Sequence, residues 1–145
     1  AHWMQLALAQ ARLAADAGVV PVGAVVVKNG QLLATGRNAP IAGHDPTAHA
    51  EVVVLRETAL KLDDTHLVGC TLVVTLEPCP MCAGAAQLAR VDRVVFGAWN
   101  DEYGAAGSAW DLLRDRRLSH RPEVVGGVLA EECGSIVKDF FARRR

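Results

Sequence analysis

Two short motifs near the middle of the chain combine residue types that bind metal ions. His49-Ala50-Glu51 and Cys79-Pro80-Met81-Cys82 supply one imidazole and two thiols, which are ligands that zinc prefers. Cys79 and Cys82 are three residues apart, so on a helix they would share one face. Each motif is expected at the start of a helix, where the helix dipole favours a thiolate. The pattern therefore predicts a zinc site formed by His49, Cys79 and Cys82.

The position of Glu51 indicates what such a site would do. Three protein ligands leave a fourth zinc position for water, which is typical of catalytic rather than structural sites. A carboxylate two residues beyond a ligand can take the proton of that water and pass it to a substrate without binding the metal. We therefore expect Glu51 to be the catalytic acid and base.

Three other interpretations of these residues remain open from the sequence. The histidine and the cysteines could be buried core residues. The cysteine pair could be a thioredoxin-like redox motif, although that leaves the His-x-Glu motif unexplained. The zinc could also be structural, with Cys70, Cys133 or His44 as its fourth ligand.

Length and composition restrict the class of protein. The 145 residues fit one domain, expected over 1–145, which can bury a core without disulfides. The chain is 51% hydrophobic with a net charge of −1, which excludes a disordered chain. No apolar run reaches the length of a membrane span, and the first residues do not resemble a signal peptide. Four cysteines in a chain without a secretory signal favour metal chemistry in the cytoplasm over disulfides.

The secondary structure that must position the motifs alternates between helices and strands. Asn29-Gly30 between two apolar runs predicts a β-hairpin. Thr47 is the expected N-cap of the second helix, and Pro78 is expected in the first turn of the third. Helices are predicted over 4–15, 48–62, 78–89 and 130–143, a helical turn over 110–114, strands over 22–28, 31–36, 71–76, 92–97 and 123–129, and loops over 38–47 and 98–109. This order predicts a three-layer α/β/α fold around a central five-stranded mixed sheet with an antiparallel start.

Longer stretches around the two motifs resemble a known enzyme family. His-x-Glu followed by Pro-Cys-x-x-Cys is typical of the zinc-dependent nucleobase deaminases. The wider sequence resembles one branch, the bacterial tRNA-specific adenosine deaminases, over about residues 3–144. This likeness rests on the segments VPVGAV at 20–25, NAPI at 38–41, HDPTAHAE at 44–51, TLEPCPMCAGA at 75–85, GAAGS at 104–108 and DFF at 139–141.

The resemblance implies a cytidine-deaminase-like fold and a specific reaction. The expected reaction is hydrolytic deamination of adenosine to inosine at the wobble position of an arginine tRNA anticodon, with one Zn²⁺ per subunit and Glu51 as proton shuttle. The expected protein is a cytoplasmic homodimer that binds the tRNA anticodon stem-loop and no membrane. A base in an RNA loop can be flipped into such a site, whereas a base in a duplex could not reach the metal.

Roles for other residues also follow from the resemblance. The flipped nucleotide would contact Asn38, Ala50 and Val22. The RNA would contact Asn100, Arg121, Phe141 and Arg144. From residue 114 onward eight Lys and Arg stand against five Asp and Glu, and we expect the basic residues at 114–121 and 143–145 to contact phosphates near the dimer groove.

Two residues depart from the family pattern, and two other functions remain open. Asn100 stands where the family usually has an acid, and Glu102 where it usually has a base. A deaminase of a free nucleobase or nucleoside, of the guanine or cytosine type, would share the zinc site and would not need the basic residues. A non-catalytic RNA-binding relative is the third hypothesis, and Glu51 argues against it because such a protein needs no proton shuttle.

Overall fold

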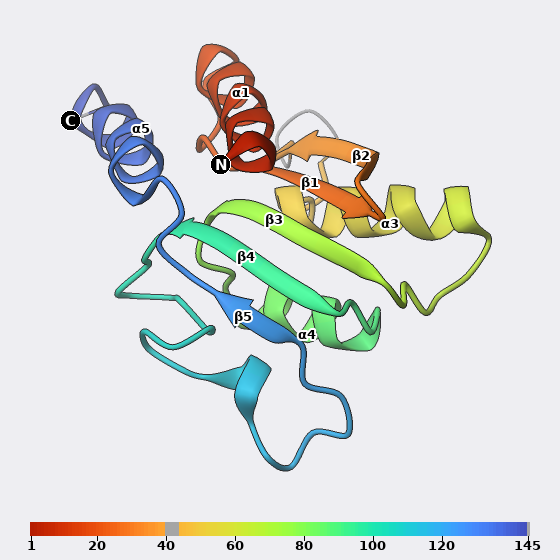
Figure 1. The fold of residues 1–145 in the computed structure, drawn as a ribbon. Helices are drawn as coiled ribbons and strands as arrows, with labels where there is room; N and C mark the ends of the chain where they lie inside the picture. Colours follow the sequence, from red (N-terminus) through yellow and green to blue (C-terminus); the bar gives the residue numbers. More distant parts are fainter. Residues whose placement is uncertain (40–43, 145) are drawn as a thin grey trace.

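The centre of the fold is a five-stranded mixed sheet (Figure 1). The structure is a computed structural model that describes residues 1–39 and 44–144. The strands lie in the order β2-β1-β3-β4-β5, with bounds β1 Gly23–Lys28, β2 Gln31–Arg37, β3 Cys70–Leu76, β4 Arg93–Ala98 and β5 Glu123–Val125. Strand β1 is antiparallel to β2 and β3, while β4 is parallel to β3 and β5. The predicted mixed sheet with an antiparallel start is confirmed.

Helices cover both faces of this sheet. On one face lie α1 (His2–Asp16) and α5 (Ala130–Ala142), and on the other lie α3 (Ala50–Leu62) and α4 (Pro80–Leu88) (Figure 1). A single 3₁₀ turn, η1 (Leu112–Arg114), packs against α4. The three-layer α/β/α arrangement is therefore confirmed. None of the helices within the described residues is long and apolar enough to cross a membrane.

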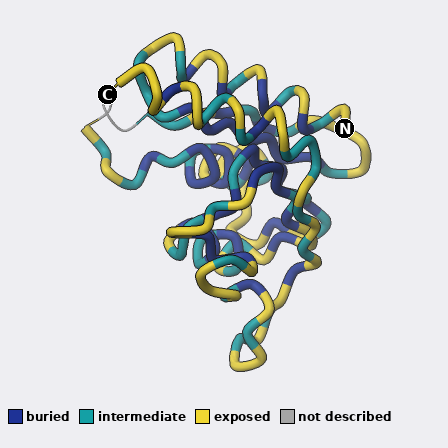
Figure 2. Tube along the Cα trace, turned by 90° about the vertical axis from the view of Figure 1, so that its left-hand side faces the viewer, coloured by how far each residue is buried: buried dark blue, intermediate teal, exposed yellow. Residues whose placement is uncertain are grey.

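Strand β1 contributes to the cores on both faces. Successive side chains of a strand point to opposite faces of the sheet. Ala24 and Val26 therefore pack on the side of α3 and α4, while Val25 and Val27 pack on the side of α1 and α5. All four side chains are buried, and Figure 2 shows the buried segments between the two helical layers. Burying one Val contributes about 1.5–3 kcal/mol, so this pattern places β1 inside the sheet rather than at its edge.

The turn between β1 and β2 follows the prediction from its two residues. Asn29 and Gly30 have φ values of 52° and 75°. A type I′ hairpin turn requires positive φ at both central residues, which Asn and Gly adopt most easily. The hairpin therefore forms where the Asn-Gly pair predicts it.

Most element bounds differ from the prediction by one or two residues, and the starts of α3 and α4 are the differences that affect the metal motifs. Helix α3 begins at Ala50 after His49, because Thr47 does not cap it: the backbone N–H and the hydroxyl of Thr47 donate to Asp45 Oδ1, at 2.9 and 2.7 Å. Helix α4 begins at Pro80, so Pro78 lies outside its first turn. Both helices begin later than predicted, and a metal-binding residue, His49 or Cys79, stands at each N-cap.

Strand β5 is shorter than predicted because of Gly126. The strand ends at Val125, and a Cβ at Gly126 would overlap the rings of Phe96 and Trp99. The chain therefore leaves the sheet against two aromatic rings, which pack edge to face at 4.8 Å. The predicted loop over 38–47 and the NAPI segment lie partly outside the described residues, because 40–43 are not described.

Candidate active site

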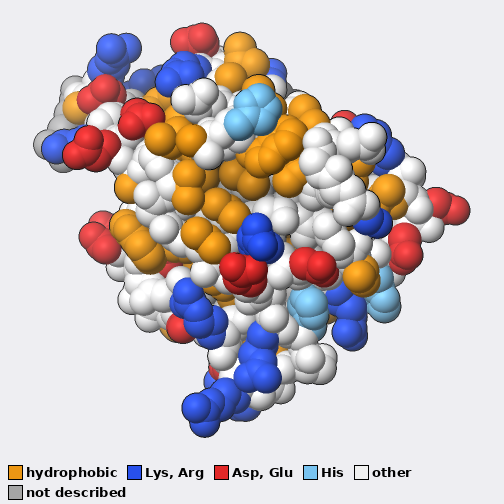
Figure 3. Space-filling view, in the orientation of Figure 1, with side chains coloured by type: hydrophobic (Ala, Val, Ile, Leu, Met, Phe, Trp, Pro, Cys, Tyr) orange, Lys and Arg blue, Asp and Glu red, His pale blue; other side chains and the backbone are white. Residues whose placement is uncertain are grey.

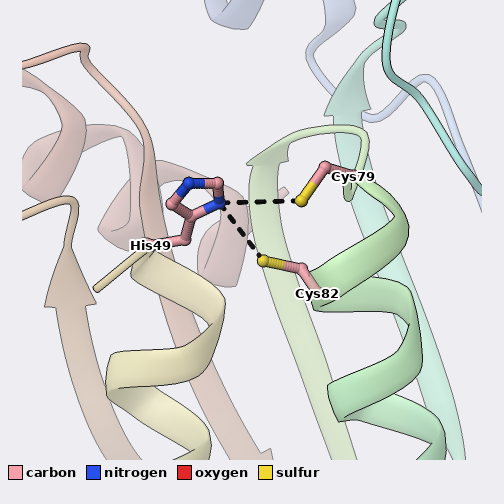
Figure 4. A group of neighbouring side chains, drawn as sticks. All are labelled: His49, Cys79 and Cys82. Carbon is pink, nitrogen blue, oxygen red and sulfur yellow. Dashed lines mark hydrogen bonds between the residues drawn. The ribbon is translucent and has the colours of Figure 1, made fainter. Parts of the chain in front are cut away.

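The three predicted metal ligands meet between the starts of two helices (Figure 4). His49 extends from the start of α3, and Cys79 and Cys82 lie at the start of α4. His49 Nδ1 is 3.7 Å from the Sγ atom of Cys79 and 3.4 Å from that of Cys82. All three ligand atoms lie within 4.8 Å of one another. Two motifs that are 30 residues apart in the chain therefore form one group.

The spacing of these atoms fits a zinc ion. In a tetrahedral site with Zn–N of about 2.0–2.1 Å and Zn–S of about 2.3 Å, a ligand nitrogen and sulfur lie about 3.6 Å apart. The two observed N···S distances, 3.4 and 3.7 Å, bracket this separation. One ion could therefore contact all three donors with little rearrangement.

The structure also decides between the catalytic and structural interpretations of the metal. Cys70 is buried on the α3–α4 side of the sheet and Cys133 on the α1–α5 side. Neither of them, nor His44, belongs to the ligand group found among residues 1–39 and 44–144. With three protein ligands and a pocket beside them, the group has the composition of a catalytic zinc site.

Hydrogen bonding gives the two cysteines different acidities. A hydrogen bond from Cys82, reinforced by one with His49, lowers the pKa of Cys79 to about 4. The hydrogen bond with Cys79, followed by burial, raises the pKa of Cys82 well above its usual range. The hydrogen bond with Cys79 also raises the pKa of His49. The group thus holds a thiolate at neutral pH, and binding a cation releases the remaining thiol proton.

Glu51 lies in the same pocket and is only 4% exposed. Burial raises its pKa to about 7. A carboxyl group with a pKa near the working pH can both accept and return a proton. These properties are those of an acid–base group beside a metal.

The three candidate ligands His49, Cys79 and Cys82, called the metal group below, lie beside a pocket of about 550 Å³. This volume is within the range of small-ligand sites. The pocket is lined by Gly18, Val19, Val20, Val22, Asn38, His49, Glu51, Leu76, Glu77, Cys79, Asn100, Tyr103, Phe140 and Arg144. Its lining therefore combines the metal group, apolar walls and polar residues from five separate segments of the chain.

Of the three predicted substrate contacts, two line the pocket. Val22 forms part of the wall, and Asn38 reaches it from the end of β2. Asn38 Oδ1 accepts a hydrogen bond from the N–H of Ala50 at 2.8 Å, and its Nδ2 donates to the carbonyl of Val20 at 3.2 Å. Ala50 is fully buried and is not among the lining residues. Its observed contribution is to hold the Asn38 side chain.

The predicted RNA contacts fall in two places. Asn100 and Arg144 line the pocket, and the Arg144 guanidinium lies 3.7 Å from the centroid of the Phe140 ring. Phe140 is buried at 7% exposure, whereas Phe141 is 51% exposed. Phe140 therefore packs in the core, whereas the ring of Phe141, the predicted RNA contact, is open to solvent. Arg121 is exposed and does not line the pocket.

The two basic segments lie at opposite ends of the molecule. In the view of Figure 1 the end of α5 is at the upper left and the loop between η1 and β5 is at the bottom. Figure 3 shows Lys and Arg side chains gathered over that lower loop. Arg145, which was grouped with Arg143 and Arg144, lies outside the described residues. Phosphate contacts by both segments would need an RNA that extends along the molecule.

Sequence reasoning missed two polar residues that line the pocket. Tyr103 lies at the rim and is 61% exposed, and nothing in its local pattern indicates a site. Glu77 is 1% exposed and directly follows the buried strand β3. An acid at that position was a usable signal, because a carboxylate that follows a buried strand needs hydrogen-bond partners.

Comparison with known proteins shows matches over most of the chain. Residues 1–98 match the family described as the cytidine and deoxycytidylate deaminase zinc-binding region. The chain is 46% identical over 143 residues to the tRNA-specific adenosine deaminase of Bacillus subtilis (strain 168), an alignment that covers 99% of this chain and 89% of the relative.

Solved structures with the same fold include enzymes for two kinds of substrate. A structure from studies of A-to-I editing by tRNA:A34 deaminases at the wobble position of transfer RNA matches with a TM-score of 0.90 and 39% identity, covering 93% of this chain and 98% of that one. A structure of the guanine deaminase of Nitrosomonas europaea matches with a TM-score of 0.84 and 26% identity, covering 97% and 83%. The sequence likeness is thus greater to the tRNA enzyme.

Proposed function

Because the chain belongs to the zinc-dependent cytidine and deoxycytidylate deaminase family, and within it to the tRNA-specific adenosine deaminases, we propose that it converts the wobble adenosine of an arginine tRNA anticodon to inosine. The observation that carries this proposal is the meeting of His49, Cys79, Cys82 and buried Glu51 in one pocket. We further propose that residues 1–145 form one deaminase domain, which acts in the cytoplasm, where its tRNA substrate would be found.

The reaction consumes one water and releases ammonia from C6 of adenine. His49, Cys79 and Cys82 would hold one Zn²⁺ per subunit. When bound, zinc supplies the Lewis-acid chemistry that makes water nucleophilic near neutral pH. Glu51 takes the proton that water gives up and delivers it to N1 of adenine, where attack at C6 places negative charge. Glu51 then takes the second proton of the water from the hydroxyl group now bonded to C6 and passes it to the amino group; the C6–N bond breaks, ammonia leaves, and the product is inosine.

Asn38 and the apolar wall would orient the base. One N–H of the Asn38 amide is bonded to Val20, and its oxygen accepts from Ala50, so the second N–H can donate to the nucleotide. Val20, Val22 and Leu76 line the pocket and would exclude water from the faces of the base. In this arrangement Asn38 sets the direction of the base, and the wall keeps the proton on Glu51 from bulk water.

The rim of the pocket would contact the anticodon loop. Phe141 is half exposed, and stacking of one base on such a ring is worth about 1–3 kcal/mol. Arg144 and Asn100 line the pocket and could contact phosphate and sugar. We also propose a homodimer in which the second subunit completes the RNA groove, as the resemblance in sequence implies.

The fold is also compatible with a deaminase of free guanine, given the match to the Nitrosomonas europaea enzyme. The two functions are separated by incubating the zinc-loaded protein with an arginine tRNA, its anticodon stem-loop hairpin, free guanine and cytidine. We expect inosine in both RNAs, detected by nuclease digestion and mass spectrometry, and ammonia from neither free compound. Ammonia from guanine without inosine in RNA would replace the proposal by the second function. Glu51→Ala is the blank for contaminating deaminases.

A further inference from the structure

Four hydrogen bonds surround the buried carboxylate of Glu77. Its Oε1 accepts from the backbone N–H of Asn100 at 3.1 Å and from the hydroxyl of Ser108 at 2.5 Å. Its Oε2 accepts from the backbone N–H groups of Ala106 and Ser108, each at 3.0 Å. The donors come from both ends of the segment 100–108, which connects β4 to η1. The Glu77 carboxylate thus binds both ends of this loop by hydrogen bonds.

The same loop is attached to the residues beside Glu77. The N–H of Ala105 donates to the carbonyl of Pro78 at 2.7 Å, and the N–H of Glu77 donates to the carbonyl of Ala98 at 2.8 Å. Pro78 is followed directly by Cys79, one of the three predicted metal ligands. Glu77 and Pro78 therefore bind the loop by hydrogen bonds, and the residue directly after them, Cys79, belongs to the metal group.

Asn100 and Tyr103 are the parts of this loop that line the pocket. Asn100 Oδ1 accepts from the N–H of Tyr103 at 3.2 Å, so the position of Asn100 also sets that of Tyr103. Both 101 and 102 are exposed. The backbone passes Glu77 very closely at Gly104, where a Cβ would overlap the Glu77 carboxyl carbon and the Asn100 carbonyl. The loop therefore depends on this carboxylate for its shape.

We propose that Glu77 is a positioning residue for the deamination reaction, and that its carboxylate holds Asn100 and Tyr103 where they contact the substrate. The inference rests on the proposed function, because it assigns the loop to binding of the tRNA substrate. Glu77 itself transfers no proton in this scheme and does not bind the metal.

Four donors around one group require a carboxylate rather than an amide. In Glu77→Gln one oxygen becomes NH₂, which cannot accept from a backbone N–H. At the Oε2 position both partners are backbone N–H groups, so the amide oxygen must stay there. The NH₂ then replaces Oε1, where the Ser108 hydroxyl can rotate to accept. The Asn100 N–H alone is left without an acceptor.

The expected effect is on KM rather than on kcat. A substrate that binds one loop conformation binds more weakly in proportion to the fraction of protein in that conformation. Loss of the acceptor for the partly buried N–H of Asn100 shifts such an equilibrium by about tenfold. Once substrate is bound the loop is in place again, and the metal group and Glu51 are unchanged. We expect KM for the anticodon hairpin to rise about tenfold in Glu77→Gln while kcat stays within about threefold.

The experiment compares Glu77→Gln with two other variants of the zinc-loaded protein. Glu123→Gln removes an exposed carboxylate that pairs with Arg93 and should keep the parental KM. Ser108→Ala removes one donor but leaves the Asn100 N–H bonded, so its KM should rise less than that of Glu77→Gln. A purely structural role predicts a lower melting temperature and less folded protein with an unchanged KM, and that result would overturn the proposal.

A measurement on the parent protein does not depend on whether Glu77→Gln folds. Hydrogen exchange followed by NMR should show slow exchange for the N–H groups of Asn100, Ala106 and Ser108, and fast exchange for 101 and 102. Equal, fast exchange at all five would overturn the anchoring role. If these three groups are protected but the parent does not deaminate the hairpin, the proposed function has failed and the anchoring of the loop has not.

Discussion

Asn38 Oδ1 accepts a 2.8 Å hydrogen bond from the N–H of Ala50, the first residue of helix α3. The N–H groups of a first helical turn have no partner within the helix, and a local side chain usually supplies one. Here the acceptor comes from the end of β2, twelve residues earlier. The contact joins the residue that would orient the substrate to the helix that carries His49 and Glu51.

Replacing Asn38 should separate its two roles. Asn38→Ala leaves the buried N–H of Ala50 without an acceptor, and the free energy of unfolding should fall by about 1–3 kcal/mol. Asn38→Asp keeps an acceptor and adds a favourable negative charge at the helix start, but it has no N–H for the nucleotide. We expect Asn38→Asp to be the more stable variant and both to lose activity, as measured by urea unfolding and hairpin deamination. Parental activity of Asn38→Asp would contradict the orienting role.

Metal content tests the ligand group directly. We expect one zinc per chain by elemental analysis of protein purified without chelators, and much less in His49→Ala or Cys82→Ala. Cys70→Ala is the matched control, because Cys70 is buried outside the ligand group. Removal of zinc with a chelator should abolish deamination, and added zinc should restore it. Full zinc content in Cys82→Ala would show that the metal is bound elsewhere.

Glu51→Gln should abolish turnover while zinc stays bound. A positioned acid–base group contributes about 10²–10⁴-fold, and Glu51 would handle more than one proton transfer, so the upper end is expected. Glu57→Gln changes an exposed carboxylate of the same helix and should keep parental activity. The measurements are single-turnover rates on the hairpin and zinc content. A rate within tenfold of the parent for Glu51→Gln would mean that another group moves the protons.

Substitution of the two adjacent phenylalanines should affect different properties, stability at Phe140 and RNA binding at Phe141. Phe140→Ala removes a buried ring and should lower the free energy of unfolding by about 3–5 kcal/mol. Phe141→Ala removes a half-exposed ring and should instead weaken hairpin binding by about 1–3 kcal/mol. Urea unfolding and fluorescence titration with labelled hairpin make the comparison. If Phe141→Ala binds the hairpin as tightly as the parent, no base stacks on this ring.

Arg144 should account for part of the salt dependence of RNA binding. Each phosphate contact with single-stranded RNA contributes about 0.7 to the slope of log K against log salt. Arg144→Ala should therefore weaken binding and make the slope shallower by about that amount. Arg90→Ala, an exposed residue that follows α4 and does not line the pocket, is the control. An unchanged slope in Arg144→Ala would place the phosphate contacts elsewhere, for instance at residues 114–121.

Asn100 carries a prediction about the sugar of the substrate. The family usually has an acid there, and a charged acceptor would hold a ribose 2′-OH more strongly than an amide. Asn100 Oδ1 already accepts from Tyr103, which weakens it further as a sugar acceptor. Asn100→Asp should therefore raise the RNA-to-DNA rate ratio on matched hairpins by a factor of several. A ratio that does not change would show that Asn100 does not read the sugar.

The metal group and the layers of the fold could be predicted because their signals are local. The spacing of Cys79 and Cys82, the Asn29-Gly30 turn and the β-branched run of β1 each restrict a few neighbouring residues, and the structure bears out all three. Where the prediction fails, a neighbour changed the outcome: Thr47 bonds to Asp45 instead of capping α3, and β5 ends where Gly126 meets aromatic rings.

The hydrogen bonds around Glu77 could not have been predicted in this way. Its partners are 23 to 31 residues away, and backbone N–H groups carry no mark in the sequence. The same holds for Asn38, whose partners Val20 and Ala50 are backbone groups of other elements. Sequence patterns thus indicated which residues meet in the metal group and the pocket, but not which residues hold them in place.

The central position of β3 also has a consequence for the order in which the molecule assembles. The β1–β2 hairpin closes over two residues, whereas the parallel pairing of β3 with β4 must wait for the crossover through α4. The hydrogen bonds to Glu77 can close only afterwards, because their donors follow β4 in the chain. The part of the pocket lining that Glu77 holds, Asn100 and Tyr103, can therefore form only after β4 has paired with β3.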